Sequence, residues 1–176
     1  MPLSIEFKGM EKIISRLSPG LLNDHLRKFL IRSSTIVQNK ARDNANERAH
    51  DSGQLLTSII PEIDSSAPPL WAKVGHLGAG EGSTLWWKAV AMEYGTGLLA
   101  EGPNASGKRH WPPPSALDVW AKRHGFPSGA VVARMIGFRG GLTPRRYLRD
   151  ALQKSLAATE NEIARVSNEI KASFES

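Results

Sequence analysis

The sequence predicts an α+β fold, in which a small antiparallel sheet is flanked by a long N-terminal and a long C-terminal helix, with a long loop and short helices inserted. Apolar residues recur at helical spacing over 21–46 and again over 148–174. Between them, residues 59–97 hold short runs rich in Ile, Val, Trp and Tyr, separated by Pro, Gly and Ser. The short connections between these runs favour antiparallel pairing. The length of 176 residues suits one domain.

Residues 1–58 are expected to form the N-terminal helices. A short amphipathic segment lies at 10–17, and Ser18-Pro19 then suits the start of the long helix, because Ser caps and Pro fits the first turn. Asp51-Ser52 offers a second cap, for a short helix through Leu55-Leu56.

Residues 59–97 are expected to form the sheet, with strands at "IIPEID", "WAKVGHL" and "LWWKAVAMEY". If the last run is a strand, Trp86 and Trp87 face opposite sides, so that one fills the core and the other is left for an interface. Glu93 and Tyr94 then close a central strand that turns at glycines into the next loop.

The rest of the chain is predicted to be a loop followed by helices. Residues 98–114 form an extended loop, and 115–143 form short helices, the first of which has the capping-box spacing at Ser115 and Asp118. Thr143-Pro144 starts a final helix over 144–176. Its apolar stripe requires a surface to pack on: the first long helix, the sheet or another copy of the chain.

Charge is concentrated in one third of the sequence. The formal net charge is +6; residues 101–150 hold nine Lys/Arg against three Asp/Glu, and the remainder has 14 of each sign. Such a segment suits contact with nucleic acid, an acidic partner or a neighbouring subunit, and a solvated basic face is the alternative.

Several classes of protein are disfavoured. The absence of cysteine excludes disulfides, thiolate catalysis and cysteine-based zinc sites. Charges between Glu6 and Lys12 argue against a signal peptide, and no run is long enough to span a bilayer, so we expect synthesis in the cytoplasm.

No motif points clearly to catalysis or to a cofactor. "GPNASGKR" (102–109) has the glycine and lysine spacing of a phosphate-binding loop, but Arg109 stands where Ser or Thr would hold magnesium. No two histidines have the i, i+4 spacing of a helical metal pair. A nuclease with Glu93 and Asp118 as metal ligands remains an alternative, whereas a carboxylate at a strand end is more often exposed or paired with Arg.

Four segments, in order, carry a resemblance to a known family: "AHDSGQLLTSI" (49–59), "AVAMEYGTG" (89–97), "HWPPPSALDVWAKRHG" (110–125) and "ARMIGFRGGLTPRRYLRDAL" (133–152). They are similar to segments of the neck and tail-completion proteins of long-tailed bacteriophages, which join head and tail. The resemblance covers residue 20 to the C-terminus. The family usually has a second Pro where this chain has Arg146, and an aromatic residue where it has Tyr147.

The resemblance implies a structural virion protein without enzyme activity or cofactor. It implies a homo-oligomeric ring, expected to be a hexamer with a dodecamer as the alternative, at the head–tail junction or the top of the tail. The implied partners are the head–tail connector, the tail terminator or the tail tube, with transient contact to packaged DNA and none to membrane.

The sequence thus gives two functional hypotheses besides the nuclease alternative. In the first, a ring is held together by candidate assembly residues: Trp86, Trp87, Glu93, Tyr94, Lys108, Arg109, Trp111, Arg145, Arg146, Tyr147 and Arg149. Within this set Glu93 is expected to pair with Arg145 or Arg149, inside or between subunits. In the second, residues 101–150 form a nucleic-acid-binding module that depends on Arg145, Arg146 and Arg149.

Overall fold

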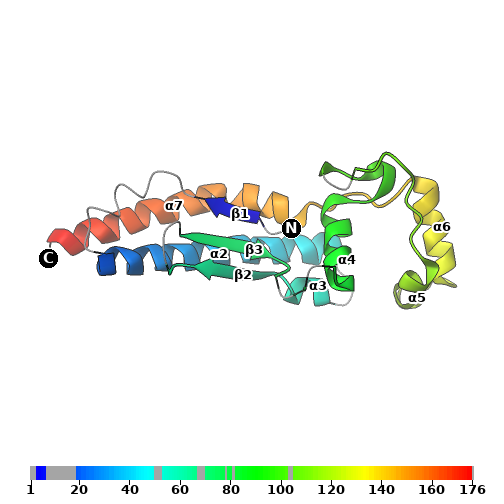
Figure 1. The fold of residues 1–176 in the computed structure, drawn as a ribbon, viewed down its shortest axis with the longest axis horizontal. Coiled ribbons are helices and arrows are strands. Elements are labelled where there is room, and N and C mark those ends of the chain that lie inside the picture. Colours follow the sequence, from blue (N-terminus) through cyan, green and yellow to red (C-terminus); the bar gives the residue numbers. More distant parts are fainter. Residues whose placement is uncertain are drawn as a thin grey trace.

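A computed structural model describes residues 3–6, 19–49, 53–66, 70–77, 79–80, 82–102 and 105–175. The α+β fold is confirmed, with a small antiparallel sheet beside two long helices. Helix α2 (Pro19–Ala49) and helix α7 (Tyr147–Glu175) lie side by side and run in opposite directions along the molecule (Figure 1). The C-terminal stripe thus has its partner within the chain, namely α2.

The sheet has three strands in the order β1-β3-β2, and both pairings are antiparallel. Strands β2 (Ile60–Asp64) and β3 (Trp71–Gly75) confirm the first two predicted strands. Strand β1 (Leu3–Glu6) was not predicted, since residues 1–58 were expected to form the N-terminal helices. The amphipathic segment at 10–17 lies outside the described residues, as do Ser18 and the Asp51-Ser52 cap. The predicted short helix is present as α3 (Gln54–Thr57), and its N-cap residue is Gly53 rather than Asp51 or Ser52.

The third predicted strand is wrong: this segment forms helix α4 (Thr84–Tyr94). Ser83 caps it, since its hydroxyl accepts a hydrogen bond from the Trp86 N–H at 3.2 Å. Gly95, with φ of 74°, ends it in a conformation that glycine adopts without strain. Trp86 and Trp87 therefore do not face opposite sides of a sheet; their rings meet edge to face, with centroids 4.6 Å apart.

Beyond α4, the chain forms a projection at one end of the molecule (Figure 1). A turn of 3-10 helix, η1 (Gly97–Leu99), leads into the long loop, and helices α5 (Pro114–Arg123) and α6 (Gly129–Arg139) follow. They are the short helices that the sequence predicted over 115–143, and they pack mainly on each other. We call residues 98–141 the arm and the remainder the body.

The predicted caps of two helices are wrong. Helix α5 begins with Pro114, so Ser115 lies inside it, and the Asp118 carboxylate instead accepts the Gly129 N–H at 2.8 Å. Asp118 thus stabilises the start of α6. Helix α7 begins at Tyr147 rather than after Thr143-Pro144, and its first turn is capped from elsewhere in the fold.

The body has two clusters of buried side chains between α2, α7 and the sheet. One lies near the α4 end and includes Val37, Ile59, Val74, Tyr147 and Leu148. It also includes alanines of α2 and α7, which allow the two helix backbones to approach closely. The base of the arm is attached beside this cluster.

Candidate functional site

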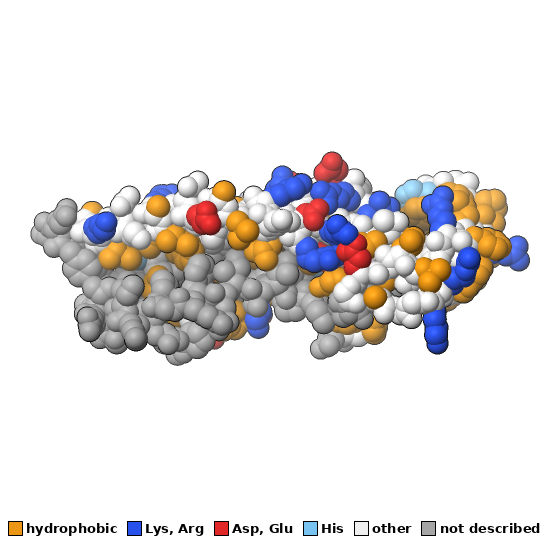
Figure 2. All heavy atoms as spheres, turned by 90° about the horizontal axis from the view of Figure 1, so that it is seen from above, with side chains coloured by type: hydrophobic (Ala, Val, Ile, Leu, Met, Phe, Trp, Pro, Cys, Tyr) orange, Lys and Arg blue, Asp and Glu red, His pale blue; other side chains and the backbone are white. Residues whose placement is uncertain are grey.

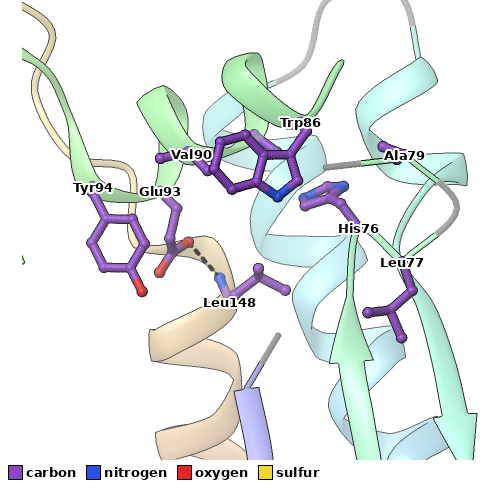
Figure 3. Close-up of a pocket in the computed structure, with 10 residues that line it drawn as sticks. His76, Leu77, Ala79, Trp86, Val90, Glu93, Tyr94 and Leu148 are labelled. Carbon is purple, nitrogen blue, oxygen red and sulfur yellow. Dashed lines mark hydrogen bonds between the residues drawn. The ribbon is translucent and has the colours of Figure 1, made fainter. Parts of the chain in front are cut away.

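Glu93 is the centre of a buried junction between α4 and α7. It is 3% exposed, and one of its carboxylate oxygens accepts the N–H of Leu148 at 2.9 Å (Figure 3). The other oxygen accepts the N–H of Arg149 at 3.1 Å. Leu148 and Arg149 are the second and third residues of α7, and their N–H groups have no hydrogen-bond partner within the helix. A carboxylate 55 positions away in sequence therefore does what an N-cap side chain usually does.

The expected ion pair of Glu93 is with Arg149, within one copy of the chain. The Arg149 Nε lies 3.0 Å from a Glu93 carboxylate oxygen, and an Arg149 Nη donates to the Glu93 backbone carbonyl at 3.0 Å. The guanidinium also lies over the Tyr94 ring, 4.8 Å from its centroid. Tyr94 and Arg149 thus contact each other, and Arg149 also bonds to Glu93 in the junction.

Glu101, at the base of the arm, extends this junction outward. It pairs with Arg146 and, at 3.1 Å, with Arg149. The hydrogen bond from Arg146 holds the pKa of the Glu101 carboxyl below its usual value. Arg146 has a φ of 50°, a left-handed backbone conformation that a proline ring cannot adopt.

Arg145 contributes mainly through its backbone. Its N–H donates to the Met92 carbonyl at 2.7 Å, and its carbonyl accepts from Arg48 at 3.1 Å. Its side chain is exposed, unlike that of the half-buried Arg149. Of the expected partners, Glu93 therefore selects Arg149 and not Arg145.

Two passes of the chain form the base of the arm and bind each other through the backbone. Thr96 N–H donates to Leu142 at 3.0 Å, and Leu98 N–H donates to Gly140 at 2.9 Å. Gly97 has a φ of 68°, and a side chain there would collide with the Gly140 carbonyl and with His110. The close approach therefore requires glycine, and it fixes the arm to the body.

A buried chain of polar groups lies behind the junction. The Ser58 hydroxyl is 2.6 Å from His76 Nδ1, and His76 Nε2 is 2.5 Å from the Tyr147 hydroxyl, which also donates to the Ala89 carbonyl. Burial lowers the pKa of His76 to about 4 and raises that of Tyr147, so both side chains are neutral at pH 7.

The positions of Glu93 and Tyr147 correct their expected role in assembly. Tyr147 is fully buried and Glu93 nearly so, and both are bonded to groups of their own subunit. They are thus not available to contact another copy in this fold. Their role is to hold α4, α7 and the base of the arm together.

A hollow of about 270 Å³ lies between α4 and the end of β3 (Figure 3). Trp86, Val90, Tyr94 and Leu148 give it a mainly apolar wall, and His76 and Glu93 border it. The polar groups of the last two are already bonded within the protein. Trp87, the neighbour of Trp86, projects into solvent and is 58% exposed.

The arm carries exposed apolar side chains around the C-terminal end of α6. Phe138 is 71% exposed, Trp111 52% and Leu98 51%, and we call these three the apolar patch. The Trp111 and Phe138 rings meet edge to face with centroids 5.6 Å apart, and Leu98 lies against Gly140. Trp111 occupies the space that a side chain at position 137 would need, so Gly137 is required for this arrangement.

The arm is also basic. Its six Lys and Arg side chains are exposed: Lys108, Arg109, Lys122, Arg123, Arg134 and Arg139. Figure 2 shows Lys, Arg and hydrophobic side chains over the arm on the visible face, whereas the acidic side chains lie over the body and the arm's base. Arg109 additionally donates to the Phe138 carbonyl at 2.9 Å and so anchors the loop beside the apolar patch.

Several of these site residues were not predicted from the sequence. Phe138, Leu98, Glu101 and His76 were not among the candidates, since nothing in the sequence marks an apolar residue as exposed or a histidine as buried. The turn signals around Phe138, with glycines at 137, 140 and 141, were the available indication of an exposed position.

No protein-family model, curated protein or solved structure matches this chain. No helix in the described ranges is long and apolar enough to cross a membrane. Over the same residues, no three His, Cys, Asp or Glu side chains are grouped so as to hold a metal ion. Glu93 and Asp118, weighed above as metal ligands, instead lie in the body and the arm respectively, and each accepts backbone N–H groups.

Proposed function

We propose that this chain is a structural virion protein that assembles into a homo-oligomeric ring at the head–tail junction, or the top of the tail, of a long-tailed bacteriophage. The observation that carries the proposal is the apolar patch on a projecting arm. Large aromatic side chains exposed together beside arginine are typical of protein interfaces. Burying them on a neighbouring copy would contribute about 25 cal/mol for each Å² of apolar surface removed from water.

The segments that resemble the phage family support this proposal by their positions. Two of them supply Glu93 and the Tyr147–Arg149 turn, which meet in the junction at the base of the arm, and a third supplies Ser58 of the polar chain behind it. The fourth supplies Trp111 and helix α5 of the arm itself. The resemblance therefore concerns residues that fix the arm and form its exposed surface.

In the proposed mechanism, the arm of one copy packs on the body of the next. Such a contact joins two different surfaces, and repeating it closes a ring when the rotation between neighbouring copies is a whole fraction of a full turn. Closure makes the contacts cooperative, and each interface can then be small. Connector, terminator or tail-tube proteins would bind the faces of the finished ring.

Mass spectrometry of purified virions, together with electron microscopy of the isolated protein, tests the function. We expect the protein in particles at a constant number of copies and ring-shaped projections of the isolated protein. A protein that stays monomeric at all concentrations and is absent from virions would contradict the proposal.

A further inference from the structure

The arm carries a positive charge that ring formation does not require. We propose that the arm binds the phosphate backbone of double-stranded DNA, without sequence-specific contacts, through Lys108, Lys122, Arg134 and Arg139. The proposal goes beyond ring assembly and does not depend on it, because the four side chains belong to one copy of the chain.

The four cations are available for a ligand. All four side chains are exposed, and within the described part of the chain none of them lies in an ion pair. The arm has two carboxylates, Glu101 and Asp118, against its six Lys and Arg. Both carboxylates are engaged, Glu101 with Arg146 and Arg149 and Asp118 with the start of α6. The positive charge of the outer arm is therefore not neutralised locally.

The body carries both signs in nearly equal number, 17 Lys and Arg against 15 Asp and Glu. Arg48 pairs with Asp150, and Arg32 and Arg165 pair with Glu162 and Glu169. A field of one sign thus projects from one end of an otherwise balanced molecule, and such a field attracts polyanions.

The residues proposed here to bind DNA differ from those that the sequence suggested. The sequence suggested Arg145, Arg146 and Arg149, but the last two are bound to Glu101 and Glu93. Neutralising them would disturb the junction and would say little about DNA. The four cations of the outer arm are instead able to donate hydrogen bonds to phosphate oxygens. Such contacts position a protein on DNA without reading the base sequence.

Double-stranded DNA is the ligand that this surface fits. The cations belong to the loop and to both arm helices, so they cover an area rather than a line. A duplex presents about one charge per 1.7 Å of its axis on two strands, which matches a broad basic surface. Single-stranded DNA would bind by stacking its bases on Trp111 and Phe138, and the test below distinguishes this from binding of a duplex.

The test is fluorescence anisotropy with a labelled DNA duplex of mixed sequence over about 50 to 200 mM salt. The arm variant removes four charges: Lys108→Gln, Lys122→Gln, Arg134→Gln and Arg139→Gln. The matched body variant removes four exposed charges from α2 and α7: Arg27→Gln, Lys28→Gln, Lys154→Gln and Lys171→Gln. Thermal unfolding of both variants checks that each is folded.

We expect wild-type affinity to fall steeply with salt, and the arm variant to bind at least about tenfold more weakly with a shallower salt dependence. The body variant should remain close to wild type. Equal losses in the two variants would show that binding follows net charge alone and would overturn the assignment. Absent or salt-insensitive binding would do the same. Tighter binding to a single strand, lost in Trp111→Leu, would overturn the choice of duplex.

Discussion

The junction in the body and the outer arm use the same kinds of side chain in opposite ways. In the junction, Glu93 and Arg149 are bonded to each other and to the backbone, and Tyr147 is fully buried. In the outer arm, Phe138 and Arg134 face solvent. An arginine or aromatic residue that looks functional in the sequence therefore stabilises the fold in the junction, whereas in the outer arm it remains available to a partner.

This difference gives a rule that mutations can test. Changes at the junction are expected to lower the free energy of unfolding, because they leave buried groups without partners. Changes in the outer arm are expected to leave stability nearly unchanged and to alter binding to other molecules.

The largest effect is expected for Glu93→Ala, at about 4 kcal/mol of lost unfolding free energy, because it removes the cap of α7 and leaves Arg149 without its buried partner. Denaturant unfolding followed by circular dichroism measures it. Glu93→Gln should lose less, since its amide oxygen still accepts a hydrogen bond. Glu160→Ala, an exposed carboxylate on the same helix, is the control. Equal stability of Glu93→Ala and Glu160→Ala would show that the junction does not hold the helix.

Gly97→Ala is expected to cost about 3 kcal/mol, since it adds a steric clash at the base of the arm to the strain of a positive φ. Gly107→Ala is a matched control, because Gly107 has nearly the same φ, 65° against 68°, but open space around it. The control should lose about 1 kcal/mol from backbone strain alone. Thermal unfolding of the two variants separates the cost of the steric clash from the cost of the backbone strain. Equal losses of stability would contradict the close approach of the two chain passes.

Stability is expected to fall by about 2 kcal/mol between pH 7 and pH 5 through His76. Its pKa is about 4 in the folded protein against 6.5 for an ordinary histidine, so the unfolded chain binds the proton first as pH falls. The contribution is complete above about pH 6.5 and is lost progressively toward pH 4. Urea unfolding at several pH values should show this slope in wild type and in the exposed His124→Gln control. His76→Gln should flatten it, and an unchanged slope would contradict a buried neutral His76.

The smallest effect on stability is expected for Phe138→Ser, at less than about 0.5 kcal/mol, because the ring is largely exposed. Val119→Ser replaces another exposed apolar residue, on α5 and away from the apolar patch, and should be equally mild. Chemical denaturation measures both. A loss of several kcal/mol in Phe138→Ser would mean that its ring packs inside the subunit.

Much of the fold was predictable because its signals are local. Long apolar stripes located α2 and α7, and the β-branched runs located β2 and β3. Helix α4 was missed because its Trp, Val and Tyr residues suggested a strand. Its length, Ser83 as cap and Gly95 as stop were the better signals. The cap of α7 was not predictable, since Glu93 reaches it from a distant part of the sequence.

Less of the candidate site was predictable, for a physical reason. The sequence predicted that Glu93 pairs with Arg145 or Arg149, and the structure shows that the partner is Arg149 of the same chain. Exposure does not follow from residue type, so the sequence placed buried Tyr147 and exposed Trp111 in the same group of candidates. The fold distinguishes them, because Tyr147 lies in the core of the body and Trp111 lies on the surface of the arm.

Light scattering of the wild type beside Phe138→Ser and Val119→Ser tests the central claim most directly. The account predicts a ring several times the mass of the 19.2 kDa chain for the wild type and for Val119→Ser, and a folded monomer for Phe138→Ser. A monomeric wild type, or an unchanged oligomer in Phe138→Ser, would contradict the assignment of assembly to the arm.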